Sequence, residues 1–179
     1  DAALDDRIEA LRQRHIGMAR ELLSGELYDE FVVELDRDCR DIAGILQTVR
    51  LVRAASTTLR DLIAGYGELW STRLFERLLR SRGLSQGRVQ WLDARRVLLV
   101  EWGPLGPGVR WEQSRSNLQM EVTPDFTGTV VITGFIATDC QGLQTTLGRN
   151  GSDFSASIFG SLFDAGEIVI WTDVDGVLS

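Results

Sequence analysis

The chain has 179 residues, of which 44% are hydrophobic and 25% charged, an ordinary balance for a globular protein with a substantial core. A net charge of -7 argues against non-specific binding to nucleic acid or anionic membranes, and no apolar run is long enough to cross a bilayer. Every basic residue except His15 is arginine, so any lysine that a mechanism needs must come from outside this chain. The two cysteines, Cys39 and Cys140, match no metal-binding spacing and predict buried, reduced thiols in a cytoplasmic protein.

The first half of the chain predicts helices. Apolar residues recur at helical spacing over residues 3–23 and again over residues 28–49, with Ser24-Gly25 between them, which predicts a helical hairpin. His15 lies on the apolar face of the first helix and is interpreted as a packed boundary residue, because no second histidine could share a metal. Charged residues of the second helix are interpreted as a solvated face: Asp36, Arg37, Asp38 and Arg40.

Two more helices are predicted before the chain changes character. A short one covers residues 57–64, capped by Ser56 or Thr57. A second is opened by the run Gly65–Ser71 and continues through about Arg82, where Gly83 ends it. Glu68 would then lie in a first helical turn, where a carboxylate complements the helix dipole. The functional alternative is a carboxylate that binds the ammonium group of a substrate.

From residue 89 onward, strands alternate with helices, which predicts an α/β domain with a largely parallel sheet. The predicted elements are strands at 89–93, 97–100, 129–136 and 167–171, a loop at 103–108, a helix at 111–120, a hairpin-like connection at 139–145 and a helix that follows the glycine-rich turn.

The glycine-rich run Thr145–Ser155 connects an apolar, β-rich segment to a helical pattern. Unpaired N–H groups and the positive end of the dipole meet at a helix N-terminus and favour an anion there. Arg149 adds a planar fork for a carboxylate or phosphate, and Ser152 is a plausible N-cap. Asp153 is placed to hold a metal ion or to orient a nucleophile. The alternative is an ordinary connection from a loop to a helix.

A second polar run, Thr172-Asp173-Val174-Asp175-Gly176, follows the last predicted strand. Because ligands of open α/β sheets bind at the carboxyl ends of strands, these carboxylates could bind a magnesium-nucleotide or its ribose. The alternative is a polar turn that uses Asp and Gly for its geometry.

Together these runs resemble aspartate kinase, of the amino acid kinase superfamily. The stretches that carry the resemblance are Thr145–Ala156, Ile170–Val177, Gly134–Ile136 and Gly67–Ser71. Gly67–Ser71, Trp91–Arg95 and Gly134–Ala137 most resemble the bifunctional aspartokinase–homoserine dehydrogenases.

The resemblance implies a fold and a domain organisation. The fold is a three-layer α/β/α sandwich with a mainly parallel sheet, preceded by a long helical hairpin. The whole of residues 1–179 would be a partial catalytic domain, with a helical part at 1–83 and an α/β part at 84–179 that carries the substrate and nucleotide motifs.

The implied reaction transfers the γ-phosphoryl group of magnesium-ATP to the side-chain carboxylate of L-aspartate, an early step toward lysine, threonine and methionine. By the family pattern, Arg149 would bind an aspartate carboxylate and Glu68 the α-ammonium group. Gly151 and Ser152 would lie against the substrate and the transferring group, and Phe135 would bound the pocket through its backbone. Asp153 would organise the catalytic groups. Thr172 and Asp173 would contact the nucleotide.

Departures from the family pattern predict an incomplete enzyme. The lysine-bearing Lys-Phe-Gly-Gly loop, the Asp-Pro-Arg segment and the regulatory ACT modules are absent from this sequence. We therefore expect the chain alone to be inactive and the full-length enzyme to be a homo-oligomer. Mg²⁺ would bind with the ATP, and the chain itself would supply no metal ligands. NADP would be needed only if a homoserine dehydrogenase domain follows. The alternatives are another superfamily kinase, acting on glutamate, acetylglutamate or a nucleotide, and a non-catalytic helical module for binding or oligomerisation.

Overall fold

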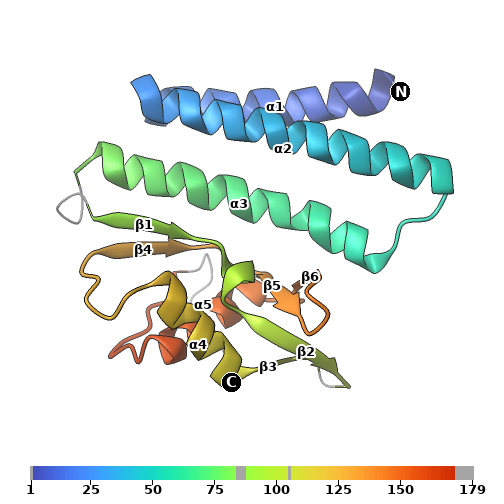
Figure 1. Cartoon of the computed structure of the whole chain (residues 1–179). Coiled ribbons are helices and arrows are strands. Elements are labelled where there is room, and N and C mark those ends of the chain that lie inside the picture. Colours follow the sequence, from blue (N-terminus) through green and yellow to red (C-terminus); the bar gives the residue numbers. More distant parts are fainter. Residues whose placement is uncertain (1, 84–87, 105, 172–179) are drawn as a thin grey trace. The chain divides into compact units, whose positions relative to one another are not determined.

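The computed structural model describes residues 2–83, 88–104 and 106–171 (Figure 1). The chain divides into two compact units. The first unit contains Asp1–Asp93 and Asp125–Thr133, and the second contains Ala94–Pro124 and Gly134–Ser179.

Three long helices dominate the first unit: α1 (Ala2–Leu22), α2 (Gly25–Val52) and α3 (Thr57–Ser81) (Figure 1). Only two residues separate α1 from α2, and the two helices pack on each other, which confirms the predicted hairpin. Apolar side chains from all three helices are buried, among them Ile16, Ala19, Phe31, Leu35, Leu69 and Leu74. His15 is half-buried with its ring edge-on to Trp70, as expected of a boundary residue.

Helix α3 corrects the predicted break near residue 65. It runs without interruption through Gly65 and Gly67, although each glycine costs a helix interior about 1 kcal/mol. Packing outweighs this cost because Leu69 and Trp70 are buried directly after the glycines. Glu68 therefore lies inside a helix and not in a first turn. The predicted cap is confirmed, since the Ser56 hydroxyl accepts a hydrogen bond from the Leu59 N–H at 3.2 Å.

Two parallel strands complete the first unit. Strand β1 (Val89–Leu92) pairs with β4 (Thr129–Ile132) in register from Val89 opposite Thr129 to Leu92 opposite Ile132, and α3 packs on both strands (Figure 1). The predicted strand 129–136 is interrupted after Ile132, because Phe135 adopts a left-handed backbone with φ of 66°.

The second unit contains a four-stranded sheet in the order β3-β2-β5-β6. Its strands are β2 (Leu99–Gly103), β3 (Gly106–Val109), β5 (Ile136–Asp139) and β6 (Gln144–Thr146), and a 3-10 helix (Ala94–Arg96) precedes β2. Strands β2 and β5 are parallel, whereas β2–β3 and β5–β6 are antiparallel hairpins. This sheet is mixed because connections of a few residues cannot make the crossover that parallel pairing requires. The predicted loop at 103–108 thus contains most of β3.

Two helices belong to the same unit, α4 (Trp111–Glu121) and α5 (Gly151–Leu162). The guanidinium of Arg115 on α4 donates to the carbonyl oxygens of Leu162 at 3.2 Å and Ser161 at 3.4 Å. The bond to Leu162 satisfies a carbonyl group at the helix end that has no intrahelical partner, whereas the Ser161 carbonyl also accepts from the Asp164 N–H at 3.3 Å. The two Arg115 bonds tie the end of α5 to α4.

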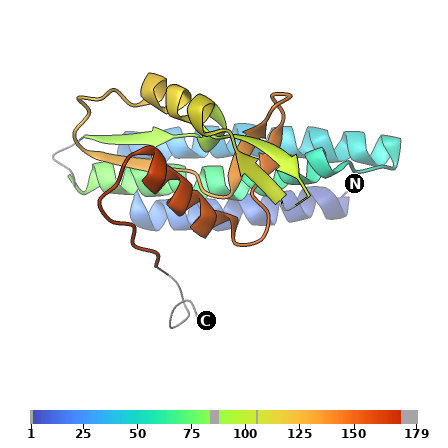
Figure 2. The same cartoon turned by 90° about the horizontal axis from the view of Figure 1, so that it is seen from below.

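The predicted strand at 167–171 is wrong. After α5 this stretch is coil (Figure 2). The side chains of Ile168, Val169 and Trp171 are exposed. A β-rich sequence forms a strand only where a neighbouring strand offers its backbone groups. No strand in residues 88–104 or 106–171 pairs with this stretch.

No helix in the described part of the chain is long and apolar enough to span a membrane.

Candidate functional site

The turn before α5 delivers the chain to the helix in a left-handed conformation. Gly148 has φ of 75° and Asn150 has φ of 59°, and the Gly151 N–H donates to the Gly148 carbonyl at 3.1 Å. The N-cap is therefore Asn150, whose side chain makes no capping hydrogen bond, and the predicted N-cap Ser152 lies inside the first turn. Sequence reasoning missed this because Asn can adopt the left-handed conformation that starts the helix two residues earlier.

This arrangement leaves polar groups available at the start of α5. The N–H groups of Ser152 and Asp153 have no hydrogen-bond acceptor among the residues that the structure describes, as expected for a helix without a side-chain cap. Arg149 is exposed, and no described residue forms an ion pair with it. Asp153 is exposed in the first turn. A fixed cationic fork and a helix N-terminus can together bind a carboxylate or phosphate.

Phe135 packs against the start of α5. Its N–H donates to the Ser155 hydroxyl at 2.9 Å, and that hydroxyl donates to the Gly151 carbonyl at 2.8 Å. The Phe135 carbonyl accepts from the Leu147 N–H at 2.7 Å. A Cβ atom on Gly151 would lie 2.7 Å from Cδ2 of Phe135, so only glycine fits there without a shift. The structure thus brings Phe135, Gly151 and the Ser152 turn together.

Ser155 is the residue of this turn to which sequence reasoning gave no role. It is buried, and its hydroxyl joins the Phe135 backbone to the first turn of α5. Its signal in the sequence was a serine four residues after Gly151 on the apolar side of the predicted helix, where a hydroxyl needs a backbone partner.

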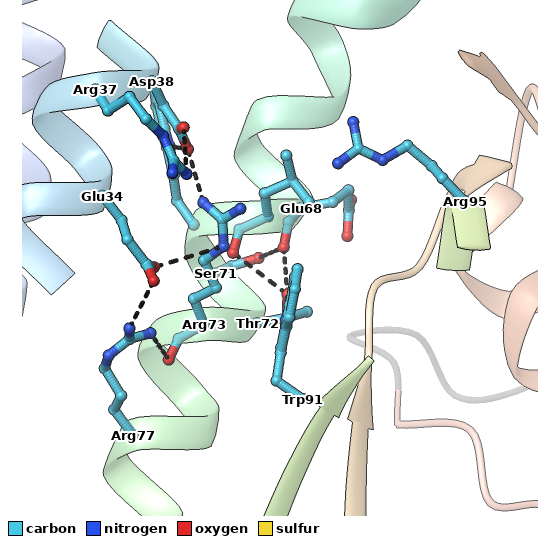
Figure 3. A network of polar contacts seen from close by, with 12 residues as sticks. Glu34, Arg37, Asp38, Glu68, Ser71, Thr72, Arg73, Arg77, Trp91 and Arg95 are labelled. Atoms are coloured by element: carbon cyan, nitrogen blue, oxygen red, sulfur yellow. Dashed lines mark hydrogen bonds and ion pairs between the residues drawn. The ribbon is translucent and has the colours of Figure 1, made fainter. Parts of the chain in front are cut away.

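Glu68 lies in the first unit, on the side of α3 that faces away from Glu34 and Asp38 (Figure 3). Its side chain is half-buried, and burial raises the pKa of its carboxyl above the ordinary value. Within the described residues of this unit, no cation pairs with the carboxylate. A carboxylate removed from water without a counter-ion is costly, and it is typical of a site that awaits a cation.

On the opposite side of α3, its arginines pair with carboxylates of α2. Asp38 is only 4% exposed and accepts from the Trp70 indole N–H at 3.0 Å and from Arg73 at 2.7 Å (Figure 3). Glu34 pairs with Arg77 at 3.0 Å and with Arg73 at 3.7 Å. We call Glu34, Asp38, Arg73 and Arg77 the α2–α3 charge network. The interpretation of Asp38 as solvated was wrong, because Arg73 from another helix compensates its burial.

The cysteines differ from each other. Cys39 is buried, and burial raises the pKa of its thiol to about 11, so the thiolate is scarce at neutral pH. Cys140 is exposed, which corrects the prediction of a buried thiol, and both cysteines are free.

Among the described residues, no group of three or more His, Cys, Asp or Glu side chains is placed to hold a metal ion. The predicted nucleotide contacts Thr172 and Asp173 lie outside the described residues.

A model of the amino acid kinase family matches residues 3–179, nearly the whole chain. The chain belongs to the amino acid kinase family. It is 36% identical over 175 residues to the chloroplastic bifunctional aspartokinase/homoserine dehydrogenase 2 of Arabidopsis thaliana, covering 96% of this chain. It is 31% identical over 175 residues to the lysine-sensitive aspartokinase 3 of Escherichia coli, again covering 96% of this chain.

The fold of this family member also resembles a solved structure. The crystal structure of E. coli aspartokinase III in complex with aspartate and ADP superposes with a TM-score of 0.82 at 28% identity, covering 98% of this chain and 38% of that chain. The chain spans 19% of the length of the Arabidopsis relative and 37% of the E. coli relative. The likeness therefore supports a mixed α/β fold with N-terminal helices, as in that aspartokinase.

Proposed function

We propose that this chain forms part of the catalytic domain of an aspartate kinase, which transfers the γ-phosphoryl group of ATP to the side-chain carboxylate of L-aspartate. The observation that carries the proposal is the half-buried Glu68 carboxylate, whose pKa burial raises and which no cation in its unit compensates. A carboxylate in this state favours binding of an ammonium group, and the α-ammonium of a free amino acid supplies one.

The turn before α5 supplies the groups for the acidic partner. Arg149 would bind a carboxylate of aspartate through its planar fork, and the free N–H groups of Ser152 and Asp153 would favour negative charge nearby. Gly151 and Phe135 would bound the substrate, since their close packing excludes a side chain at position 151. The Phe135 carbonyl keeps one lone pair for a substrate group beside the Leu147 bond.

Phosphoryl transfer requires little covalent work from a protein, so positioning and neutralisation of charge dominate. Asp153, exposed in the first turn of α5, would organise the groups around the phosphoryl centre, and Thr172 and Asp173 would contact the nucleotide. Mg²⁺ would arrive on the ATP phosphates. A lysine that balances the phosphates would come from outside the chain, because the sequence contains none.

Two comparisons between substrates test this function in the complete protein. Wild type should phosphorylate L-aspartate in preference to L-glutamate, and it should reject N-acetyl-L-aspartate, which lacks the ammonium group. Glu68→Gln should lose much of the discrimination against the acetylated compound. If wild type prefers N-acetylated acceptors, the assignment to an acetylglutamate-type kinase replaces this one.

Other properties of the whole protein belong to the same proposal. A role toward lysine, threonine and methionine follows from 4-phosphoaspartate as product, and a homo-oligomer is expected for the complete enzyme. A homoserine dehydrogenase activity with NADP would require a further domain of the kind that the Arabidopsis relative's name includes. A cytoplasmic location stays a prediction, and that relative is named as chloroplastic.

A further inference from the structure

Trp91 on β1 is held by α3 at both its edge and its face (Figure 3). Its indole N–H donates to the Thr72 hydroxyl at 2.9 Å, and the Arg73 guanidinium lies over the ring at 5.0 Å from its centroid. A guanidinium over an indole face is a favourable cation–π arrangement. Two consecutive residues of one helix therefore fix a single aromatic side chain of a neighbouring strand.

The Thr72 hydroxyl passes this constraint on to Glu68. An indole N–H can only donate, so the Thr72 oxygen accepts from Trp91 and its own proton is left for another acceptor. That acceptor is the Glu68 carbonyl at 2.7 Å, with the Leu69 carbonyl farther away at 3.4 Å. The backbone of Glu68 is thus connected through one hydroxyl to a side chain on β1.

Arg73 is itself immobilised by the α2–α3 charge network. Its side chain is 13% exposed, donates to Asp38 at 2.7 Å and pairs with Glu34 at 3.7 Å. Because the guanidinium is fixed from the α2 side, its position over Trp91 is fixed as well. The tether from β1 to Glu68 consequently has a rigid support.

The turn of α3 before Glu68 has a low intrinsic helix propensity. Gly65 and Gly67 lie directly before Glu68, and each weakens the helix by about 1 kcal/mol relative to alanine. An added Cβ on Gly67 would meet no atom within 4 Å, so open space lies beside this turn of the helix. A half-buried carboxylate without a cation gains free energy by moving toward water, and the weak turn beside it offers a way to do so.

We propose that Trp91 and Thr72 are positioning residues for Glu68: they hold the α3 turn that keeps this carboxylate half-buried and ready for the substrate's ammonium group. The proposal rests on the proposed function for that last clause, whereas the tether itself does not. It also gives a physical role to the Trp91 stretch, which the proposed catalytic groups leave unexplained.

The test compares five forms of the complete protein: wild type, Trp91→Phe, Thr72→Val, Thr72→Ser and Trp70→Phe. The Glu68 pKa is measured by ¹³C NMR titration of its side-chain carboxyl carbon, assigned by its loss in Glu68→Gln, and kinetics are measured with L-aspartate and ATP. Trp91→Phe and Thr72→Val should lower the Glu68 pKa toward the ordinary glutamate value. They should also raise the KM for L-aspartate about threefold to tenfold, as expected when one hydrogen bond is lost, with the KM for ATP unchanged.

Two variants separate positioning from general loosening. Thr72→Ser keeps the hydroxyl and should behave as wild type. Trp70→Phe removes an indole hydrogen bond to buried Asp38 on the same helix, so it should lower Tm while leaving the Glu68 pKa and the KM for L-aspartate unchanged. Thr72→Val conserves volume, so it decides the outcome if Trp91→Phe does not fold.

The outcomes distinguish this proposal from the proposed function. A Glu68 pKa that is unchanged in Thr72→Val, or lowered equally in Trp70→Phe, overturns the positioning role whatever the substrate is. A pKa that falls as expected, in a protein that does not phosphorylate L-aspartate, supports the tether and rejects the function instead.

Discussion

The α2–α3 charge network and the turn before α5 both contain arginines, but the arginines differ in burial and in ion pairing. In the network, Arg73 and Arg77 are largely buried, and each forms ion pairs with carboxylates of α2. In the turn, Arg149 is exposed without an ion-pair partner among the described residues. Burying a guanidinium is tolerable only with compensation, whereas an exposed one keeps its water until a ligand replaces it.

The carboxylates of α3 show the same contrast. Glu76 is buried beside Arg80, with an ion pair at 3.5 Å, whereas Glu68 is half-buried and lacks a cation in its unit. Burial raises the pKa of both carboxyl groups. Glu76 thus has its counter-charge on the same helix, whereas under the proposed function the counter-charge of Glu68 would be the substrate's ammonium group. The following experiments test this distinction.

The largest effect is expected at Asp38. Asp38→Ala leaves buried Arg73 without its closest carboxylate and the Trp70 indole without its acceptor, so we expect a loss of about 3–5 kcal/mol in the free energy of unfolding. Asp36→Ala, two residues earlier on α2, breaks a more exposed pair with Arg12 and should cost about 1 kcal/mol or less. Denaturant titration of both variants checks this. Equal losses would show that the network does not depend on buried compensation.

Arg149 should affect substrate use and not stability. Arg149→Ala in the complete protein should raise the KM for L-aspartate roughly tenfold to a hundredfold, because a charge-assisted bidentate contact contributes about 1.5–3 kcal/mol. Its free energy of unfolding should change by less than about 0.5 kcal/mol, as is usual for an exposed side chain. Arg149→Lys should recover part of the loss, since lysine keeps the charge but not the fork. Equal losses for ATP and aspartate would contradict the assigned role.

Glu68 should show opposite effects on binding and stability. Because its folded-state pKa is raised, the protonated form is favoured by folding, and that contribution is lost as pH rises through the folded pKa. Glu68→Gln should therefore raise Tm by about 1–3 °C at neutral pH, and the difference should vanish at pH values below the ordinary glutamate pKa. Thermal unfolding across this pH range measures it.

The same residue predicts the pH dependence of catalysis. Only the ionised carboxylate attracts an ammonium group, so the wild-type KM for L-aspartate should rise as pH falls through the raised pKa of Glu68. In Glu68→Gln this rise should be absent, while the KM at neutral pH is already high. A wild-type profile that matches the profile of the variant would argue against Glu68 as the ammonium ligand.

The smallest effect is expected at an exposed ion pair. Arg110 and Glu101 lie 2.8 Å apart with side chains 46% and 60% exposed. A double-mutant cycle with Arg110→Ala and Glu101→Ala should give a coupling of about 0.2–1 kcal/mol that decreases in high salt. A coupling as large as the loss of about 3–5 kcal/mol expected for Asp38→Ala would mean that burial is not what separates the two kinds of pair.

Local periodicity predicted the elements whose own residues determine them. The α1–α2 hairpin, the helix at Trp111, strand β1 and the hairpin after Asp139 all follow from helical spacing, alternation or turn residues. The failures share a cause, because each depended on a distant partner. Gly65 and Gly67 remain helical since Leu69 and Trp70 are buried, and 167–171 is coil since no described strand pairs with it.

The site residues that the sequence suggested stay predictions, and the contacts around them could not be predicted from the sequence. The sequence suggested Arg149, Gly151 and Glu68, but the burial of Asp38 depends on Arg73, 35 residues away along the chain. Nor could the spacing of residues show that Thr72 connects Trp91 to Glu68. The hydrogen bond from the Trp91 indole to the Thr72 hydroxyl, and from that hydroxyl to the Glu68 carbonyl, forms only where the strand packs on the helix.

The packing of Phe135 on Gly151 makes two positions, 16 residues apart in the sequence, depend on each other. The left-handed backbone of Phe135 stores about 1–3 kcal/mol of strain, which a glycine there would relieve. Its ring, however, occupies the space that any side chain at 151 would need. An alanine at 151 should thus be harmful beside Phe135 and far better tolerated beside glycine, so in natural variants or in engineering we expect these two positions to change together.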